Sequence, residues 1–284
     1  AYAWDKNFNI PALNAAAADY KENVDPEFEL EVIEQSGGGD IENAITLAGS
    51  AHDYSNLPDI VQFQDHYIQR YVADYPDAFV PVEGADIDWD GFSKEKLSYS
   101  IVDGVHYGVP VDNSTVIFAY RTDLLAEVGK TVDDMTGIKW SDLTDIGEQK
   151  YEKTGKYLFS TSADGGDLVY MMMQSEGVAE FKDGEPWITE NETLHRVCET
   201  IVDMGKRKAC YLANSWSDYI DQSIQGDMVA GVLNGNWIIP TMEAVTENSG
   251  KWEITTIPTL DGGEGYASNG GCGLYITANC GNVD

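Results

Sequence analysis

Three patterns of residues that could form a catalytic or ion-binding site bear on the 284-residue chain. The first is the glycine-rich segment 36–45 (SGGGDIENAI), which lies between a strand-like and a helix-like run, as phosphate-binding loops do. It lacks the Gly-Lys-Ser/Thr ending and the G-x-G-x-x-G order. Asp40 and Glu42 also place negative charge where a phosphate would bind. We interpret the segment as a turn capped by Asp40.

The second segment, 86–91 (DIDWDG), matches the first half of a calcium-binding loop. Carboxylates stand at loop positions one, three and five, with glycine at six. Position nine is Lys94, and position twelve is Leu97 where a bidentate glutamate is needed. A solvated acidic loop without a metal ion is the better interpretation.

The third pattern, a catalytic nucleophile with its base, finds little support. The G-x-S-x-G motif is absent, and the four histidines stand in unrelated contexts: His52, His66, His106 and His195. Carboxylate pairs for glycoside hydrolysis are unavoidable among 49 acidic residues, so they carry no weight. Neither C-x-x-C nor Cys/His spacing occurs, although a disulfide such as Cys198–Cys210 stays open. We expect a protein that is not an enzyme and holds no cofactor.

The chain has seven Trp and 16 Tyr, and several of them stand next to carboxylates or amides. This pairing is the pattern in the sequence that indicates a binding site. A sugar ring has an apolar face that packs on an indole and a rim of hydroxyls that carboxylates and amides can bind. Burying about 100 Å² on one Trp contributes roughly 2.5 kcal/mol. Four such groups stand at 4–5, 64–67, 216–218 and 236–237. We assign Trp140, Trp187 and Trp252 to the core or the surface.

Composition restricts the class of partner. The chain is 43% hydrophobic and 23% charged, which is typical of a globular protein, and it has no apolar run of about 20 residues. Its 17 basic and 49 acidic residues give a net charge of −32. Such a surface repels phosphate backbones and anionic lipids, which disfavours nucleic-acid and membrane-surface functions, while neutral and cationic ligands remain compatible.

The first hundred residues alternate between helix and strand patterns. Apolar residues have helical spacing in 13–20 and 41–48. The alternation in 28–33 (FELEVI) and the run from Pro58 predict strands. Strand, helix and strand within about 35 residues form a βαβ unit, so we expect a largely parallel sheet.

A second α/β region begins with the apolar run 116–120, which is too short for a helix. Thr189 and Glu192 predict a capping box at the start of its clearest helix. The other predicted elements are helices at 140–153, 168–175 and 190–206 and strands at 228–233 and 252–257. The two regions are joined near 108–115 and again near 258–270, and two connections are what a hinged pair of lobes requires.

Five segments, in this order, resemble the family of extracellular solute-binding proteins that serve oligosaccharide ABC importers, especially those of Gram-positive gut bacteria. They are 1–13 (AYAWDKNFNIPAL), 57–79 (LPDIVQFQDHYIQRYVADYPDAF), 107–125 (YGVPVDNSTVIFAYRTDLL), 226–242 (GDMVAGVLNGNWIIPTM) and 268–277 (SNGGCGLYIT). The resemblance implies a two-lobed, periplasmic-binding-protein-like α/β fold with a ligand cleft between the lobes. We assign 1–110 plus 262–284 to lobe one and 111–261 to lobe two.

The resemblance also implies ligand-binding residues in lobe one and at the first crossing between lobes. Trp4 and Asp5 would lie at the cleft edge, and Asp65 would accept hydrogen bonds from sugar hydroxyls. Asp112 and Asn113 would contact the ligand from the crossing, although Asp112 is equally compatible with a role in bracing the hinge.

For lobe two, the resemblance implies that Trp216 and Trp237 supply stacking faces. Asn269 and Gly270 would offer polar and backbone contacts at the return crossing, although a role for Asn269 in shaping its turn stays open. The resemblance implies no catalytic and no metal-binding role for any of these residues.

The function implied by the resemblance is that of an oligosaccharide-binding protein. It would act as a monomer, close about a hinge and deliver its ligand to an ABC permease. The full-length form would be extracellular, tethered as a lipoprotein and extended by C-terminal helices, so we expect this chain to be a C-terminally truncated form. Two alternatives remain: a secreted carbohydrate-active enzyme, and the same scaffold binding a polyamine, a peptide or a metal chelate.

Overall fold

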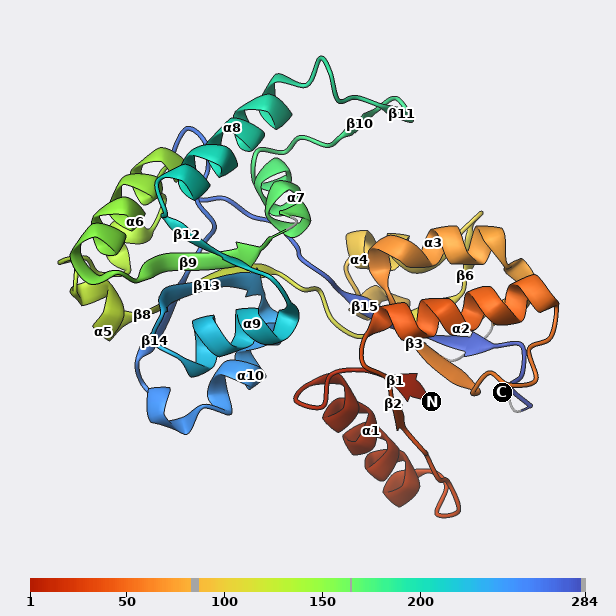
Figure 1. Ribbon diagram of the computed structural model, residues 1–284. Coiled ribbons are helices and arrows are strands. Elements are labelled where there is room, and N and C mark those ends of the chain that lie inside the picture. Colours follow the sequence, from red (N-terminus) through yellow and green to blue (C-terminus); the bar gives the residue numbers. More distant parts are fainter. Residues whose placement is uncertain (83–86, 164, 282–284) are drawn as a thin grey trace. The chain divides into compact units, whose positions relative to one another are not determined.

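The computed structural model describes residues 1–82, 87–163 and 165–281 (Figure 1). Its contacts divide the chain into two compact units: unit 1 is Ala1–Asn113 with Gly270–Asp284, and unit 2 is Ser114–Asn269. The sequence placed the return to the first unit after residue 261. Residues 262–269 lie with unit 2 because Gly265 N donates to Ile257 O and Asn269 N donates to Ser114 O.

A six-stranded mixed sheet forms the centre of unit 1, in the order β2-β1-β3-β15-β4 with β7 also paired to β15. The strands are β1 (Tyr2–Ala3), β2 (Ile33–Glu34), β3 (Ile60–Gln64), β4 (Phe79–Val80), β7 (Gly108–Pro110) and β15 (Cys272–Thr277). Strands β1, β2 and β3 are parallel, but β15 runs antiparallel to its partners. The prediction of a largely parallel sheet is therefore wrong for β15. The chain enters this strand from unit 2, so no crossover helix imposes a parallel direction.

The helices of unit 1 are α1 (Asn9–Asn23), α2 (Gly38–Ala51), α3 (Asp65–Asp74) and α4 (Lys94–Ser100). The predicted apolar face of α2 is confirmed, because Ile41, Ile45 and Ala48 are buried in the core of the unit. Helix α1 also forms as predicted, but its only buried residue is Asn9. The predicted strand at 28–33 is reduced to β2, which begins at Ile33, because only this end of the segment reaches β1.

Shorter elements complete unit 1. They are the 3₁₀ turns Pro76–Ala78 and Trp89–Gly91 and the hairpin β5 (Ile101–Val102) and β6 (Val105–His106). Trp89 stacks on His106, with ring centroids 4.3 Å apart. Of the segment compared with a calcium loop, Asp88 and Asp90 are exposed, and Asp86 lies outside the described residues.

Unit 2 has a five-stranded sheet in the order β12-β9-β13-β8-β14. The strands are β8 (Val116–Arg121), β9 (Tyr157–Ser162), β12 (Cys210–Ala213), β13 (Val229–Gly235) and β14 (Trp252–Thr255). Strands β12, β9 and β13 are parallel, whereas β8 is antiparallel to both of its neighbours. As with β15 in unit 1, the antiparallel strand is the one that the chain forms directly after a crossing.

The helices of unit 2 are α5 (Thr122–Ala126), α6 (Trp140–Thr154), α7 (Gly166–Ser175), α8 (Glu192–Lys206), α9 (Trp216–Ile220) and α10 (Ile239–Glu243). Its short elements are the 3₁₀ turns Asp133–Met135, Asn236–Ile238 and Thr246–Asn248, the π-helical turn Asp221–Gln225 and the hairpin β10 (Phe181–Lys182) and β11 (Glu185–Pro186). Helices α6, α7 and α8 were all predicted. The predicted cap of α8 is wrong. Asn191, and not Thr189, caps this helix by accepting a hydrogen bond from Leu194 N.

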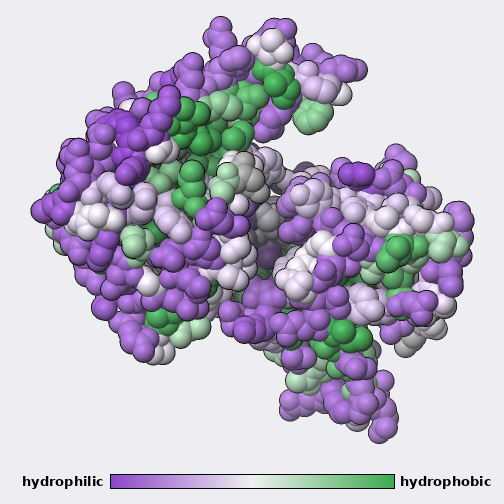
Figure 2. Space-filling model, in the orientation of Figure 1, coloured by the Kyte–Doolittle hydropathy of each residue, from purple (hydrophilic) through white to green (hydrophobic). Residues whose placement is uncertain are grey.

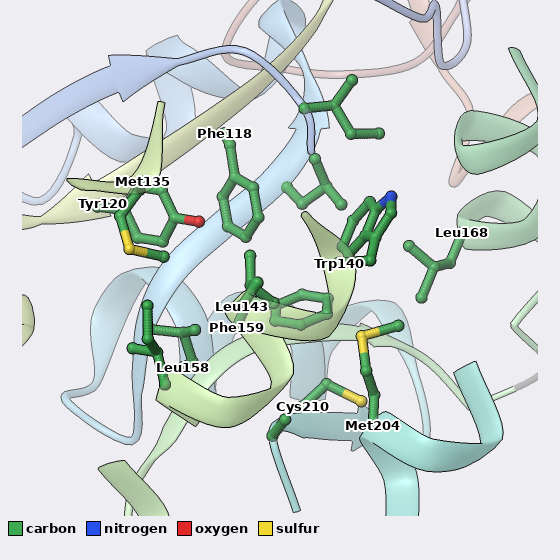
Figure 3. Packing of buried hydrophobic residues seen from close by; sticks show 14 of the residues in the cluster. Phe118, Tyr120, Met135, Trp140, Leu143, Leu158, Phe159, Leu168, Met204 and Cys210 are labelled. Atoms are coloured by element: carbon green, nitrogen blue, oxygen red, sulfur yellow. The ribbon is translucent and has the colours of Figure 1, made fainter. Parts of the chain in front are cut away.

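The main core of unit 2 lies between the sheet and helices α6 to α8 (Figure 3). Phe118 stacks on Tyr120 with centroids 4.3 Å apart, and Phe159 meets Phe118 edge to face. Trp140 is fully buried, as assigned from the sequence. Cys210 belongs to this cluster, and all four cysteines, which lie in the described part of the chain, are free thiols. The Cys198–Cys210 disulfide left open by the sequence is therefore not formed.

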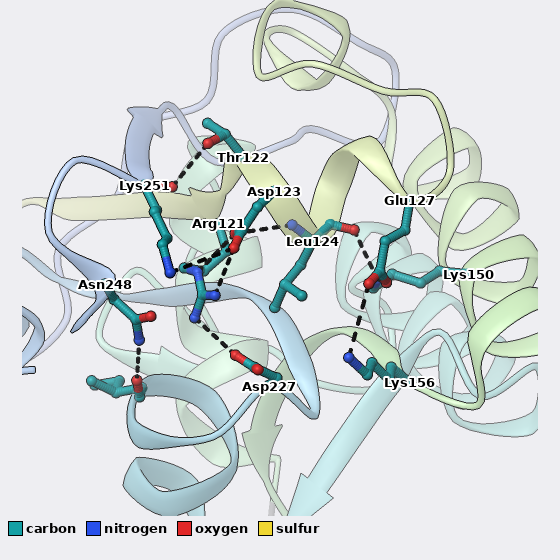
Figure 4. Close-up of polar contacts among 11 residues, drawn as sticks. Arg121, Thr122, Asp123, Leu124, Glu127, Lys150, Lys156, Asp227, Asn248 and Lys251 are labelled. Carbon is teal, nitrogen blue, oxygen red and sulfur yellow. Dashed lines mark hydrogen bonds and ion pairs between the residues drawn. The ribbon is translucent and has the colours of Figure 1, made fainter.

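Buried cations tie the end of β8 to the rest of unit 2 (Figure 4). Arg121 is 2% exposed, and its guanidinium donates to both carboxylate oxygens of Asp123 and lies 3.1 Å from Asp227. Lys150 is fully buried and donates to Leu124 O and to Glu127. These contacts satisfy the buried charges and join β8 and α5 to the start of β13 and to α6.

Polar residues cover most of the face seen in the space-filling view, and apolar residues gather over α7 and α8 of unit 2 (Figure 2). Exposed apolar side chains of unit 2 include Ile188 and Val202. Within the described ranges, no helix is both long enough and apolar enough to cross a membrane.

Candidate functional site

Unit 2 contains a pocket at the carboxyl ends of its parallel strands β9, β12 and β13. This is the edge of an α/β sheet at which ligands bind most often, because the loops that follow the strands leave a crevice there. Strand ends, two helices and the return crossing all contribute to the lining. The described lining residues are Thr161, Ser162, Asp167, Met171, Ser215, Trp216, Tyr219, Leu233, Asn234 and Asn269.

An aromatic wall bounds one side of this pocket. Trp216 and Tyr219 are three residues apart on α9, so they lie on one helix face, and their rings stack at 5.2 Å with an interplanar angle of 9°. Trp237 lies 5.7 Å from Trp216 at an angle of 42°. Trp216 is 54% exposed, whereas Tyr219 is buried behind it. The exposed indole is thus an apolar platform that the buried Tyr219 ring supports.

Hydrogen bonds fix the rings of this wall. Tyr219 Oη donates to Leu233 O at 3.2 Å, and burial raises the pKa of this phenol well above its ordinary value. Trp237 Nε1 donates to Asn269 O at 2.7 Å. Gly235 stands beside them, and a Cβ there would collide with the Trp237 ring and with Asn269 O. The approach of the ring to the return crossing therefore requires glycine at this position.

The polar side of the pocket consists of amides, hydroxyls and one carboxylate. Asn234 Oδ1 accepts hydrogen bonds from Gly235 N and from Asn269 Nδ2, both at 2.9 Å, so the two buried amides hold each other. Asp167 stands in the first turn of α7, is exposed, and has no hydrogen bond or ion pair to any described residue. An apolar platform facing free polar groups can bind a ring that has an apolar face and a hydroxylated rim.

In unit 1 the structure brings Asp65 and Asp112 together around Lys96 and Cys272. Asp65 and Lys96 are each 5% exposed and form an ion pair, and Lys96 Nζ also donates to Cys272 O at 3.0 Å. Cys272 N donates to Asp112 Oδ1 at 3.3 Å. Burial raises the pKa of Asp65 to about 6, against the opposing effect of the Lys96 ammonium. Asp65 therefore already has a buried partner within the protein.

The remaining residues predicted for unit 1 occupy different environments. Asp5 has a φ of 68°, and its Oδ1 accepts hydrogen bonds from Asn7 N and Phe8 N just before α1. Trp4 is half-buried against the core of unit 1. Asn113 is exposed, and Gly270 has a φ of 94°, a conformation that favours glycine.

Around the pocket, the structure thus gathers Trp216, Trp237 and Asn269 of the predicted residues. It adds three that sequence reasoning missed: Asp167, Tyr219 and Asn234. The spacing of Tyr219 from Trp216 was a usable signal, because residues three apart share a helix face. Asp167 on α7 and Asn234 on β13 gave no such signal, since only the pairing of β9 with β13 brings these parts of the chain together.

Comparison with known proteins places this chain in a family. The family model described as bacterial extracellular solute-binding protein matches residues 15–284. The lactose-binding protein of Rhizobium radiobacter is 31% identical over 278 residues, which are 97% of this chain and 65% of the relative. The chain thus spans just under two thirds of that protein's length.

Two solved structures have the same fold. The GacH receptor of Streptomyces glaucescens, solved without ligand and with acarbose, matches with a TM-score of 0.82 and 20% identity over 100% of this chain and 72% of its own. The binding protein of B. animalis subsp. lactis in complex with β-1,6-galactobiose gives 0.80 and 17%, over 97% and 67%. These likenesses confirm the predicted periplasmic-binding-protein-like fold. Together with the family model, they establish that this chain belongs to the bacterial extracellular solute-binding proteins.

Proposed function

We propose that this protein binds an oligosaccharide outside the cytoplasm and delivers it to an ABC permease, without changing it chemically. The observation that carries the proposal is the exposed Trp216 platform, which stacks on Tyr219 and shares a pocket with amides, hydroxyls and the Asp167 carboxylate at the carboxyl ends of three parallel strands. In this site one sugar ring packs on the indole, and its hydroxyls bind the side chains of Asp167 and Asn269.

The energetics of the platform suit a transport receptor. About 100 Å² of apolar sugar surface packed on one indole contributes roughly 2.5 kcal/mol. Several hydrogen bonds and a second stacked ring would bring the total to about the −8 kcal/mol of micromolar binding, after ordering costs. Affinity in this range allows both capture and release.

The names of related proteins support a sugar as ligand. The Rhizobium relative is a lactose-binding protein, and the two solved structures contain acarbose and β-1,6-galactobiose. Those ligands differ in their units and linkages, so they support the class of ligand and not one particular sugar.

Hinge closure is the mechanism that suits two units joined by two chain crossings. The crossings follow Asn113 and Asn269, and β7 and β15 pair directly beside them in unit 1. Ligand binding would favour a closed form in which both units contact the sugar, and the permease would recognise that form. The predicted contacts of Trp4, Asp5, Asp112, Asn113 and Gly270 belong to this part of the proposal.

Isothermal titration calorimetry with lactose, maltose, β-1,6-galactobiose and arabino-oligosaccharides tests the proposal. We expect saturable binding of at least one sugar and a loss of at least tenfold in affinity in Trp216→Ala, since about 1.5–2.5 kcal/mol of stacking is removed. Tyr266→Ala is the matched control, because Tyr266 is an exposed aromatic residue of unit 2 outside the pocket.

Two results would contradict the proposal. One is binding of a polyamine or a peptide with no response to any sugar. The other is release of reducing ends from these oligosaccharides on long incubation, if that release is abolished in Asp167→Asn, because the pocket would then belong to an enzyme.

A further inference from the structure

The unit 2 pocket carries little charge in its described lining. Of the described residues that line it, only Asp167 is an acidic or basic side chain, and neither lysine, arginine nor histidine is among them. The other polar lining residues are hydroxyls and amides. Among the described lining residues, a ligand therefore meets a single formal charge, and that charge is negative.

The arginines of unit 2 and its buried Lys150 do not compensate for this charge. Its three arginines are each engaged with carboxylates: Arg121 with Asp123 and Asp227, Arg196 with Asp261, and Arg207 with Asp145 and Glu148. Lys150, which is fully buried, pairs with Glu127. The net charge of −32 adds a repulsive background for any anion.

The position of Asp167 also removes the usual attraction of a helix N-terminus for anions. The first turn of α7 borders the pocket, and the N-terminus of a helix carries partial positive charge. Asp167 stands within that turn, so a carboxylate is already present next to this partial charge. A ligand carboxylate, phosphate or sulfate would find this position already taken by an anion.

A neutral sugar suits the same groups. Its hydroxyls donate hydrogen bonds, and carboxylate and amide oxygens accept them. Hydrogen bonds to a charged acceptor are about twice as strong as those between neutral groups. Asp167 thus strengthens the binding of a hydroxylated ring and opposes that of an acidic one.

We infer that this pocket selects an uncharged sugar unit and that Asp167 is the specificity-determining residue that rejects sugar acids. The inference rests on the proposed function and adds a substrate class to it, namely oligosaccharides whose bound unit carries no carboxylate, phosphate or sulfate.

The test compares matched ligands. Lactose, maltose and β-1,6-galactobiose, and the same sugars oxidised at C6 of the terminal unit to a uronic acid, are titrated into the protein at low and high salt. We expect the neutral member to bind at least tenfold more tightly at low salt. This ratio should shrink in 0.5 M NaCl, where charges are screened beyond about 4 Å.

The variant Asp167→Asn keeps the shape of the side chain and removes its charge. We expect the ratio of neutral to acidic affinity to fall at least fivefold in this variant, even if both ligands bind more weakly. Asp142→Asn is the matched control, because Asp142 is an exposed acid in the first turn of α6, outside the pocket, and the ratio should not change.

The outcomes separate this inference from the proposed function. If the uronic acids bind as well as the neutral sugars, or if Asp167→Asn leaves the ratio unchanged, the inference is wrong while sugar binding stands. If none of these sugars binds, neutral or acidic, the proposed function fails and the inference fails with it.

Discussion

Asp65 illustrates how the environment of one residue decides its role. The resemblance to the solute-binding family implied that it accepts hydrogen bonds from a sugar. In the structure it is 5% exposed and paired with Lys96, which is equally buried and also bonded to Cys272 O. Two buried charges that satisfy each other stabilise the local structure only as a pair, because losing one leaves the other unpaired in a medium of low polarity.

Replacing Lys96 by Met should therefore lower the free energy of unfolding by about 3–5 kcal/mol at pH 8. Burial already raises the pKa of Asp65 to about 6, and without the opposing ammonium it rises further. An acid whose pKa is raised in the folded state contributes stability below its unfolded pKa and loses it as the pH rises through the folded one. The loss of unfolding free energy caused by Lys96→Met should consequently be smaller at pH 5 than at pH 8.

Urea denaturation of the wild type and the variant at both pH values measures this effect. Lys94→Met on the same helix is the matched control, because Lys94 is exposed and its replacement should change the unfolding free energy by less than about 0.5 kcal/mol. A loss of unfolding free energy that grows towards pH 5 would contradict the role given to the buried Asp65–Lys96 pair.

At the scale of elements, the start of α8 shows what spacing can and cannot indicate. The pair Thr189 and Glu192 has capping-box spacing, yet the helix begins one residue after Asn191. The Asn191 side chain is fully buried, accepts from Leu194 N and donates to Ala179 O and Trp187 O. The helix is thus capped by the residue whose side chain can form hydrogen bonds both with the helix and with the segment before it.

Asn191→Ala should lower the free energy of unfolding by about 2–3 kcal/mol, since it removes a cap and leaves two carbonyls of the 179–187 segment without their donor. Thr189→Ala should change it by less than about 0.5 kcal/mol, because no hydrogen bond of the Thr189 side chain is found among the described residues. Thermal and urea denaturation of the two variants would distinguish the caps. An equal loss in both would show that the helix begins at Thr189.

At the scale of the whole molecule, the excess of acidic residues dominates. The 49 acidic residues outnumber the 17 basic ones, and like charges oppose a compact state. Ion pairs such as Arg207 with Asp145 and Glu148 are exposed on one or both sides and contribute little.

Added salt should therefore stabilise the protein. Between 10 mM and 500 mM NaCl we expect the free energy of unfolding, measured by urea denaturation at pH 7.5, to rise by on the order of 1–2 kcal/mol as repulsion is screened. Sucrose at matched osmolality is the control for non-ionic effects. A decrease in stability with salt would mean that ion pairs outweigh the repulsion.

The sequence by itself determined the local elements and the class of fold. Helical spacing found α2, α6, α7 and α8, and apolar runs found β8 and β13, because burial of one face repeats with the period of the element. The resemblance of five ordered segments identified the family, and the pairing of aromatic with polar residues pointed to Trp216 and Trp237.

Only the tertiary structure decided which residues meet. The direction of β15 and β8 depends on where the chain enters each sheet, which periodicity does not record. Asp65 and Asp167 are both aspartates at helix starts, yet one is buried against Lys96 and the other stands free in the pocket. Burial and partners distinguish them, and both arise from strand pairing between segments far apart in the chain.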